Sequence, residues 1–442
     1  MPNDNNCLQP IMIPLLPTFV TFICKRLKHA GHQAYLVGGA LRDACLGRPV
    51  TDWDVATSAT SVAIERIFHD KKYFALKEDT VTLVDSGHHF HVTPFRTGKG
   101  GLMGDLGHRD FTINAMAFDL DRDKISDPYG GRPDLSKRVI RAVRDPEKRL
   151  REDPLRLLRA VRIASELGFR VEPATLKTIT SMAFLLESVA PERIREELIK
   201  ILMSPRPSVG FNLMVRTGLL NHFLPELLEG YRRRQNNYHR HTIFKHIMMT
   251  VDTVKPDPVL RLTALLHDIA KPRVRKKVAG QWRFHGHEEA SAELAKGVME
   301  RLRFNKEITG KVINLVRHHM IGYNSDWTDA AIRRLIRRVG VEQMEDLLVF
   351  RRSDILAHGL KSQNLDLLSE LKKRIKDQIR HKVPTEIKDL AINGHVVMEV
   401  TGLSPGPEVG RVLKELNEKV MDRPELNKAE ELVALLQHMK TH

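Results

Sequence analysis

Cysteine is scarce in this chain of 442 residues. Its three cysteines, Cys7, Cys24 and Cys45, lie far apart and form no CxxC pair. This spacing argues against a disulfide framework and against a zinc knuckle, and it is typical of proteins in a reducing cytosol. We therefore expect a cytoplasmic location.

Long apolar runs, internal repeats and low-complexity segments are also missing. The apolar run from Ile11 to Cys24 is broken by Pro14 and Pro17, and it lacks the basic start and small-residue cleavage site of a signal peptide. It is also too short to span a bilayer. We expect it to be the first helix of a domain, and we expect no membrane partner.

Positive charge is what the chain has in excess. Lys and Arg outnumber Asp and Glu by 71 to 55, a formal charge of +16. A field of that sign attracts polyanions and favours a nucleic-acid partner. The content of 42% hydrophobic and 29% charged residues is that of a soluble globular protein, and the length suggests roughly three to four domains.

The sequence divides into four zones of different texture. Residues 1–145 contain short β-type runs separated by glycine-rich turns, which predicts a small α+β head with a mixed sheet. Helical periodicity takes over from Pro146, so we expect an all-helical neck (146–228), a helical domain with several histidines (229–382) and a helical tail (383–442). The expected strands are Ala34–Leu36, Thr80–Val84, His89–Thr93 and Ala115–Leu120, and the expected neck helices include Leu155–Leu167 and Thr175–Leu186.

The most informative stretch joins two glycines to two aspartates. Gly38 and Gly39 directly follow an apolar strand, where glycine lets the backbone pass close to a phosphate and the next helix offers free N–H groups. Asp52 and Asp54 lie at positions i and i+2 of a β-type run, so their carboxylates point to the same face. Such a pair can hold Mg²⁺ ions that align a hydroxyl with a nucleoside triphosphate. The alternative is a glycine turn followed by an exposed acidic loop.

Here the sequence resembles the class II nucleotidyltransferases. That family includes CCA-adding enzymes, their CC-adding and A-adding specialists, and bacterial poly(A) polymerases. The resemblance covers nearly the whole chain and rests on LVGGALRDACLG, TDWDVAT, HRDFTINAMAFD, DPYGGRPDL, REDPLRLLRAVRIASELGF and ERIREELIKIL, all in family order.

The resemblance implies a role for individual residues. Asp52 and Asp54 match the catalytic metal-binding pair, and His91 stands where the wider superfamily often has a further acidic residue, so we assign no third carboxylate ligand. The triphosphate-binding segment and the ribose-recognition motif, where a carboxylate can accept the 2′-OH, correspond to Gly38, Gly39, Arg42, Arg109, Asp110 and Asn114.

Glu152–Arg156, with Arg159 one turn later, match the family's base-selecting motif. Asp is acceptor-only and Arg is donor-only, so a side-by-side pair complements the Watson–Crick edge of C or A and opposes G and U. On a helix, positions i and i+3 share a face, which makes Asp153 and Arg156 suitably spaced. The alternative is that Asp153 and Pro154 start a helix and the arginines form a solvated stripe.

The segment from Thr97 to His108 bears on which nucleotides are added. Full CCA-adding relatives have a longer flexible loop here, whereas this one is short and glycine-rich, which resembles the CC-adding specialists. We therefore predict template-independent addition of CC to tRNA from CTP. The alternative is that the length of this loop varies without effect on nucleotide choice. In that case the activity is complete CCA addition with CTP and ATP, or a poly(A) or A-only activity.

The histidine-containing zone resembles the HD superfamily of metal-dependent phosphohydrolases. The resemblance rests on YHRHTIFKHIMMTVD, ALLHDIAKP and RRSDILAHG, and it implies metal ligands at His246, His267, Asp268 and Asp354. This ligand set suits Mn²⁺, Ni²⁺ or Zn²⁺ better than Mg²⁺, and His287 and His318 are candidates for a second ion. The expected chemistry is hydrolysis of a 2′,3′-cyclic phosphate or a phosphomonoester; loss of activity with retention of the fold is the alternative.

The tail resembles the family's RNA-gripping region. Gly402 is expected to cap one helix, and Pro405 to Pro407 to start the next; a plain helical hairpin is the alternative. Two rivals to the transferase hypothesis remain at this stage. One makes the HD phosphohydrolase the main activity, with the head as an RNA-binding remnant, and the other is a non-enzymatic RNA-binding module.

Overall fold

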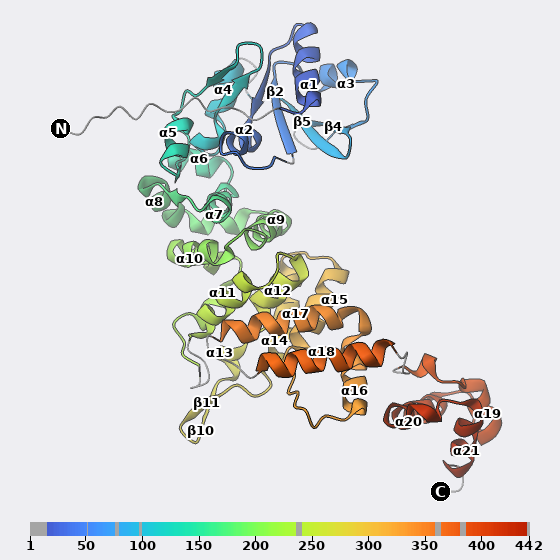
Figure 1. Ribbon diagram of the computed structural model, residues 1–442. Coiled ribbons are helices and arrows are strands. Elements are labelled where there is room, and N and C mark those ends of the chain that lie inside the picture. The colour runs from blue at the N-terminus through green and yellow to red at the C-terminus, as the bar shows by residue number, and fades with distance from the viewer. Residues whose placement is uncertain are drawn as a thin grey trace. The chain divides into compact units, whose positions relative to one another are not determined.

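The structure is a computed structural model that describes residues 16–50, 52–75, 79–96, 100–235, 241–358, 364–380 and 386–439. The chain forms two compact units (Figure 1). The first consists of Met1–Ile201 with Val209–Phe223, and the second of Leu202–Ser208 with Leu224–His442. None of the helices in these described ranges is long and apolar enough to cross a membrane.

The first unit is built on a seven-stranded sheet with the order β3-β4-β5-β2-β1-β6-β7. Only β2 and β5 pair in parallel, and the other neighbours are antiparallel. The sheet is therefore mixed, which confirms the predicted class of the head. The strands are β1 (Ala34–Val37), β2 (Asp52–Thr57), β3 (Tyr73–Ala75), β4 (Val81–Asp85), β5 (His88–Pro94), β6 (Ala117–Asp119) and β7 (Lys124–Ser126).

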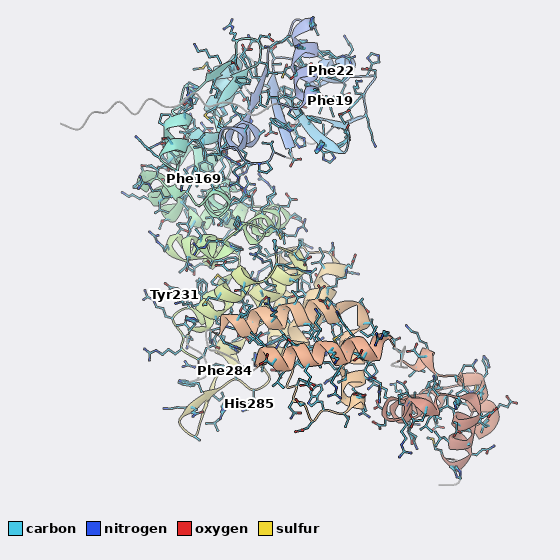
Figure 2. The ribbon with its side chains drawn as sticks, in the orientation of Figure 1. Phe19, Phe22, Phe169, Tyr231, Phe284 and His285 are labelled. Carbon is cyan, nitrogen blue, oxygen red and sulfur yellow. The ribbon has the colours of Figure 1, made fainter. Side chains whose placement is uncertain are left out.

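The two faces of this sheet are covered differently. On one face lie α1 (Thr18–His29) and α3 (Ser61–Ile67). Phe19 of α1, which Figure 2 labels, packs with its ring centroid 4.8 Å from that of Phe90. On the other face, the short helix α4 (Gly101–Gly107) packs through Leu106 against a small apolar cluster. Because successive strand residues alternate in direction, this second face is also the one toward which Val37 and Ala56 point.

The N-terminal helix begins later than predicted. The expected helix ran from Ile11 to Cys24, whereas α1 starts at Thr18, directly after Pro17; residues 11–15 lie outside the described ranges. Its buried side, including Ile23 and Leu27, faces the sheet and α3. Cys24 is part of that side, and burial raises the pKa of its thiol to about 12.

The neck is a series of short helices. One predicted helix, Thr175–Leu186, is in fact α8 (Pro173–Ser181) followed by a 3₁₀ turn. The hydroxyls of Thr178 and Thr180 bond back to carbonyls one turn earlier, a pattern that weakens helix continuation. Between the sheet and the neck lie α5 (Gly131–Ser136) and β8 (Val139–Ile140). The neck, expected to be all-helical, contains one short strand, β9 (Arg170–Val171), which pairs with β8. Its other elements are α6 (Pro146–Glu152), α7 (Arg156–Leu167), η2 (Ala183–Ser188), α9 (Pro191–Leu202), α10 (Pro207–Thr217) and η3 (Leu219–His222).

Helices also dominate the second unit, as predicted, with one small hairpin of β10 and β11. Its elements are η4 (Pro225–Gly230), α11 (Ile243–Thr253), α12 (Pro258–Leu266), α13 (Lys271–Val274), β10 (Lys276–Val278), β11 (Gln281–Arg283), α14 (His287–Arg301), α15 (Lys306–His318), α16 (Asp329–Val339), α17 (Val341–Ala357) and α18 (Asn364–Arg380).

The last part of this unit has a small core of its own. It contains η5 (Ile387–Asp389), α19 (Gly394–Thr401), α20 (Pro407–Asp422), η6 (Pro424–Leu426) and α21 (Ala429–Met439). Gly402, with φ of 76°, ends α19 and donates its N–H to Met398 O at 2.8 Å, and α20 starts at Pro407. Both predicted helix boundaries are confirmed.

Candidate functional site

A polar cavity of about 270 Å³ opens in the first unit at the end of β1. Its walls come from the strands β1, β2 and β5 and from the helices α2 (Gly38–Cys45) and α7. The lining side chains and glycines are Val37, Gly38, Gly39, Arg42, Asp54, Val55, Thr93, Arg96, Arg109, Asp110, Asn114, Arg159 and Arg162. Arginine therefore outnumbers carboxylate in this cavity, which favours an anionic ligand.

The cavity begins where β1 turns into α2. Gly38 has φ of +75°, a backbone conformation that residues with a Cβ rarely adopt. A Cβ at this position would lie 2.9 Å from Asp54 Oδ2 and 3.0 Å from Arg109 Nη1. The backbone thus approaches the carboxylate as closely as glycine permits, and the first turn of α2 opens into the cavity.

Asp52 and Asp54 lie on β2 as predicted. Strand pairing sets Asp54 beside Val37 of β1 and beside His91 of β5. Trp53, between the two aspartates, points to the opposite face and is buried, so the carboxylates share the cavity face.

Electrostatics at this pair favour a cation. Burial raises the pKa of Asp54; Arg109 and His91 act in the opposite direction, and the neighbouring Asp52 raises it further. A carboxylate that is costly to ionise beside a second carboxylate is stabilised by a divalent ion. His91 bonds to Thr82 Oγ1 at 2.9 Å, so the strand beside Asp54 carries an imidazole in place of a third acid.

A hydrogen-bond chain runs along the floor of the cavity. Arg42 donates to Asn114 Oδ1 at 2.9 Å, and Asn114 Nδ2 donates to Asp110 Oδ1 at 2.9 Å. Asp110 also faces Arg159 at 3.5 Å and accepts from the N–H of Phe111 at 2.8 Å. Burial alone would raise the pKa of Asp110, but the charge of Arg159 and these hydrogen bonds lower it to about 2. Asp110 is therefore an ionised acceptor.

The segment joining Arg96 to Arg109 is held by a carboxylate that the sequence analysis missed. Asp105 of α4 is 1% exposed. It accepts from Arg109 Nε and Nη2 at 3.1 and 3.0 Å and from the backbone N–H of Arg96 at 3.3 Å. The sequence contained a signal for this pairing, because Asp105 is the only acidic residue of the glycine-rich segment and lies four positions before Arg109. Residues 97–99 lie outside the described ranges.

The structure does not place Asp153 and Arg156 on one helix, so the spacing argument for that pair is wrong. Asp153 is extended and lies between α6 and α7, and Arg156 is the first residue of α7. The carboxylate of Asp153 pairs with Arg193 through two bonds of 3.1 Å. Arg156 instead donates to the carbonyl oxygens of His108 and Arg149 at 3.0 and 2.8 Å.

The neck contributes two other arginines to the cavity. Arg159 was predicted, and Arg162 was missed although it lies three positions later and so shares its face of α7. The carboxylate of Glu197, which is 3% exposed, lies 3.1 Å from Arg162 Nη1 and 3.8 Å from Arg159 Nε. Glu197 fixes both guanidinium groups against the cavity wall.

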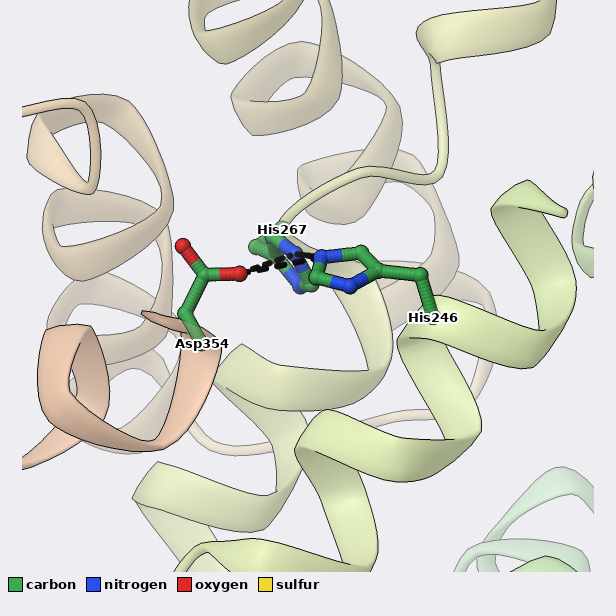
Figure 3. A group of neighbouring side chains, drawn as sticks. All are labelled: His246, His267 and Asp354. Carbon is green, nitrogen blue, oxygen red and sulfur yellow. Dashed lines mark hydrogen bonds and ion pairs between the residues drawn. The ribbon is translucent and has the colours of Figure 1, made fainter. Parts of the chain in front are cut away.

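The second unit brings together the predicted HD residues. His246 comes from α11, His267 and Asp268 follow α12, and Asp354 comes from α17 (Figure 3). Asp354 Oδ1 lies 2.9 Å from His246 Nε2 and 3.5 Å from His267 Nε2, and the two Nε2 atoms are 3.3 Å apart. All four side chains are buried.

The tautomer of His267 can be read from its other nitrogen. His267 Nδ1 lies 2.9 Å from Ala264 O, and because a carbonyl only accepts, Nδ1 carries the proton. Nε2 is then the nitrogen that faces the centre. Burial would lower the pKa of His267, but Asp268 and Asp354 raise it to about 9, so without a metal ion Nε2 binds a proton, and a bound metal ion would take the place of that proton.

A second group of the same kind adjoins the first. The Nδ1 atoms of His287 and His319 lie 2.8 and 2.7 Å from Phe284 O and Val316 O, and their Nε2 atoms are 3.3 Å apart. Two lone pairs facing each other at this distance repel unless a cation or a proton lies between them.

Asp268 contacts both groups. Its Oδ2 lies 3.4 and 3.2 Å from His246 and His267, and its Oδ1 lies 3.4 and 3.8 Å from His287 and His319. The donor sets His246–His267–Asp354 and Asp268–His287–His319 each fit one transition-metal ion.

The choice of His318 for the second ion was wrong. Its Nδ1 bonds to Asn314 O at 3.0 Å, and the side chain is only half-buried. The buried face of α15 contains Val312, Leu315 and Val316, and a period of 3.6 residues continues that face at position 319. Helical phase therefore identifies His319, and the sequence already contained this signal.

Comparison with known proteins identifies the domains in which the two candidate sites lie. Residues 34–141 match the Poly A polymerase head domain, 168–230 a probable RNA- and SrmB-binding site of polymerase A, and 243–359 the HD domain. The A-adding tRNA nucleotidyltransferase of Deinococcus radiodurans is 35% identical over 407 residues, which cover 87% of this chain and 91% of that protein. This chain belongs to the tRNA nucleotidyltransferase family.

Further relatives within the family differ in the nucleotides they add. The CC-adding tRNA nucleotidyltransferase of Thermus thermophilus is 34% identical over 403 residues, covering 87% of this chain and 89% of that one. A crystal structure of the Bacillus stearothermophilus CCA-adding enzyme in complex with CTP shares 28% identity, with a TM-score of 0.73 and coverage of 97% and 98%. Identity to A-adding and CC-adding relatives is thus nearly equal, and overall similarity establishes the family without selecting a nucleotide.

The Gly38 turn gives a test of the site's construction. Gly38→Ala should lower the local stability of the sheet by at least ~1–2 kcal/mol, because alanine is strained at this φ and its Cβ meets Asp54. Gly39→Ala is the matched control, since its Cβ would meet nothing closer than 3.6 Å. Hydrogen exchange of residues 34–57 measures the effect, and equal protection in the two variants would contradict the proposed close approach.

Proposed function

We propose that this chain adds two cytidines to the 3′ end of tRNA from CTP, without a template, and releases pyrophosphate. The observation that carries the proposal is the Asp52–Asp54 pair on one face of β2, with Asp54 beside the Gly38 turn in an arginine-lined cavity. The tRNA 3′-hydroxyl is the nucleophile, and Mg²⁺ held by the two aspartates would align it with the α-phosphate and stabilise the leaving pyrophosphate. The first turn of α2 and Arg42 contact the triphosphate.

In this proposal the nucleoside is recognised by residues at the floor of the cavity and in the neck. Asp110, kept ionised by Arg159, accepts the ribose 2′-OH, with Asn114 fixing its orientation. Base selection by Asp153 and Arg156 remains our proposal. It requires Asp153 to leave Arg193, and Arg156 to leave His108 O, when the nucleotide is bound.

Restriction to cytidine follows from how the Arg96–Arg109 segment is anchored. Its described part is the helix α4, which Asp105 fixes to Arg109 and to the backbone of Arg96. A short anchored segment leaves little freedom for the pocket to change from C to A after two additions. Complete CCA addition with ATP, and A-only or poly(A) addition, are the alternatives.

The metal pair is tested by substitution. Asp52→Ala and Asp54→Ala should each lower nucleotide addition by about 10³-fold or more, because charge developing during transfer loses its stabilisation. The affinity for tRNA should stay within about 3-fold of wild type, because binding relies on spread basic contacts. Asp85→Ala, at the end of β4 in the same sheet, is the control and should keep full activity. Near-normal turnover in either Asp52 or Asp54 variant refutes the assignment.

The product pattern tests the restriction to cytidine. A tRNA ending at the discriminator base should gain two C residues and stop, even with ATP present, and a tRNA already ending in CC should accept little or no A. Grafting the longer loop of a CCA-adding relative between Arg96 and Arg109 should restore some A addition. Gels at single-nucleotide resolution read the products, and efficient AMP incorporation by the unmodified protein would replace this proposal with complete CCA addition.

A second function is favoured by the buried histidine centre. We propose that the HD domain hydrolyses a phosphate ester, either a 2′,3′-cyclic phosphate or a phosphomonoester. The opposed Nε2 atoms of the two histidine pairs support it. Mn²⁺, Ni²⁺ or Zn²⁺ bound there would activate water and polarise the phosphoryl oxygens. Lys271 and Arg351 pair with Asp268 and Asp354, and they also line the adjoining cavity, where they would contribute positive charge beside the phosphate.

Metal content and activity together test this centre. Protein loaded with Mn²⁺ should hold about two ions per chain in the HD domain, falling to about one in His319→Ala and unchanged in His318→Ala, its neighbour outside the ligand set. His267→Ala and Asp268→Ala should abolish phosphohydrolase activity and leave nucleotide addition at the wild-type rate. Elemental analysis counts the ions. Equal losses in the His318 and His319 variants, or no hydrolysis by the wild type with any of these metals, would count against the proposal.

A further inference from the structure

The β10–β11 hairpin of the second unit is strongly basic. Residues 269–287 contain no Asp or Glu (Figure 1 shows the two strands of this segment). The basic residues of this segment are Lys271, Arg273, Arg275, Lys276, Lys277 and Arg283. The chain as a whole already carries excess positive charge. This run therefore concentrates positive potential at the hairpin.

Part of this charge is neutralised within the protein and part is not. Lys271 pairs with Asp268 at 2.6 Å, and Arg273 pairs with Glu229 at 2.6 Å. Lys276, Lys277 and Arg283 are exposed, and no carboxylate of the described ranges lies within ion-pair distance of them. Three exposed cations therefore remain for an external anion.

The hairpin also carries a flat aromatic surface. The guanidinium carbon of Arg275 lies 3.5 Å from the centroid of the Trp282 ring, and Trp282 is only partly buried. Arg275 Nε is buried and has no hydrogen-bond partner among the described residues. An Arg–Trp stack flanked by lysines is the combination that single-stranded nucleic acids use, with bases on the flat surface and phosphates on the cations.

The hairpin leads directly into the histidine centre. A cavity of about 320 Å³ is lined by the ligands Asp268, His287, His319 and Asp354 and also by Arg283 and His285. Figure 2 labels Phe284 and His285, which follow β11 and precede the first ligand of α14. A polyanion bound along the hairpin thus has one end at the metal-ligand cavity.

We propose that the β10–β11 hairpin is a nucleic-acid-binding arm that directs the terminal phosphate ester of a strand into the HD cavity. This inference rests on the proposed phosphohydrolase and names its substrate class: a phosphate at the end of an oligonucleotide in preference to that of a free nucleotide. In the reaction, the oxygen of water bonds to phosphorus, the P–O ester bond breaks, and the departing alkoxide takes the proton that water releases. No electron transfer is involved.

Steady-state kinetics of paired charge-reversal variants test the arm. With an octanucleotide bearing a terminal phosphate, Lys276→Glu/Lys277→Glu should raise KM about 10-fold with kcat unchanged, because the loss falls on phosphate contacts. The KM for a nucleoside 3′-monophosphate should not change. The control, Lys373→Glu/Lys376→Glu, makes the same charge change on exposed positions of α18 and should match the wild type for both substrates.

Photocrosslinking gives a readout that does not depend on hydrolysis. A 4-thiouridine near the phosphorylated end of the octanucleotide should crosslink to residues 275–285 of metal-free protein, and the yield should fall about 5-fold or more in the hairpin variant but not in the control. Oligonucleotides with 3′-phosphate, 2′,3′-cyclic phosphate and 5′-phosphate identify the accepted end. If nothing is hydrolysed but the crosslink forms, the phosphohydrolase fails and the binding arm stands.

Three results overturn the arm itself. They are a crosslink absent from residues 275–285, an equal KM change in the hairpin variant and the α18 control, and hydrolysis of a phosphoserine peptide or free nucleotide as efficient as that of the oligonucleotide. Circular dichroism and thermal unfolding of both double variants establish that the substitutions leave the fold intact, since all four lysines are exposed.

Discussion

The antiparallel pairing of β1 with β2 is the constraint on which the transferase site depends. It sets Val37 opposite Asp54, so the chain leaves β1 directly beside a carboxylate. Only a residue without a Cβ can turn there, and Gly38 does so at φ of +75°. That turn starts α2 beside the aspartates. The backbone that we propose binds phosphate and the carboxylates that we propose bind metal thus come together through one strand register, and a slip of a single residue would separate them.

Around this point the protein balances an excess of arginine with a few buried carboxylates. Asp105 holds Arg109, Asp110 faces Arg159, and Glu197 holds Arg162. Each carboxylate is almost fully buried, so each pair resists solvent screening and fixes its guanidinium in place. The arginines are therefore oriented before a nucleotide arrives, which lowers the entropy that binding must overcome. Asp105 performs this task for the segment on which our proposal of CC addition rests.

The sequence was sufficient to predict features that depend only on local patterns, such as the periodicity of a strand or the end of a helix. The shared face of Asp52 and Asp54 follows from strand alternation, and the end of α19 follows from Gly402. Such patterns were insufficient for contacts between distant residues, such as the pairing of Asp153 with Arg193, forty positions along the chain. The position of Asp153 outside α7 is a different case, because Pro154 disfavours the helical conformation at the residue before it, and this local signal was in the sequence. At His318 too the local signal was present, in the helical phase of α15.

The two candidate metal sites differ in the donor groups that they offer to a cation. At β2 the donors are carboxylates on a partly exposed strand, which suits a hard ion that keeps some of its water. In the HD domain the donors are mainly imidazoles whose Nδ1 protons are fixed by the carbonyls of Ala264, Phe284 and Val316. Fixed tautomers and burial suit a transition metal. Because the two sites belong to separate units and share no ligand, either chemistry can change without altering the ligands of the other.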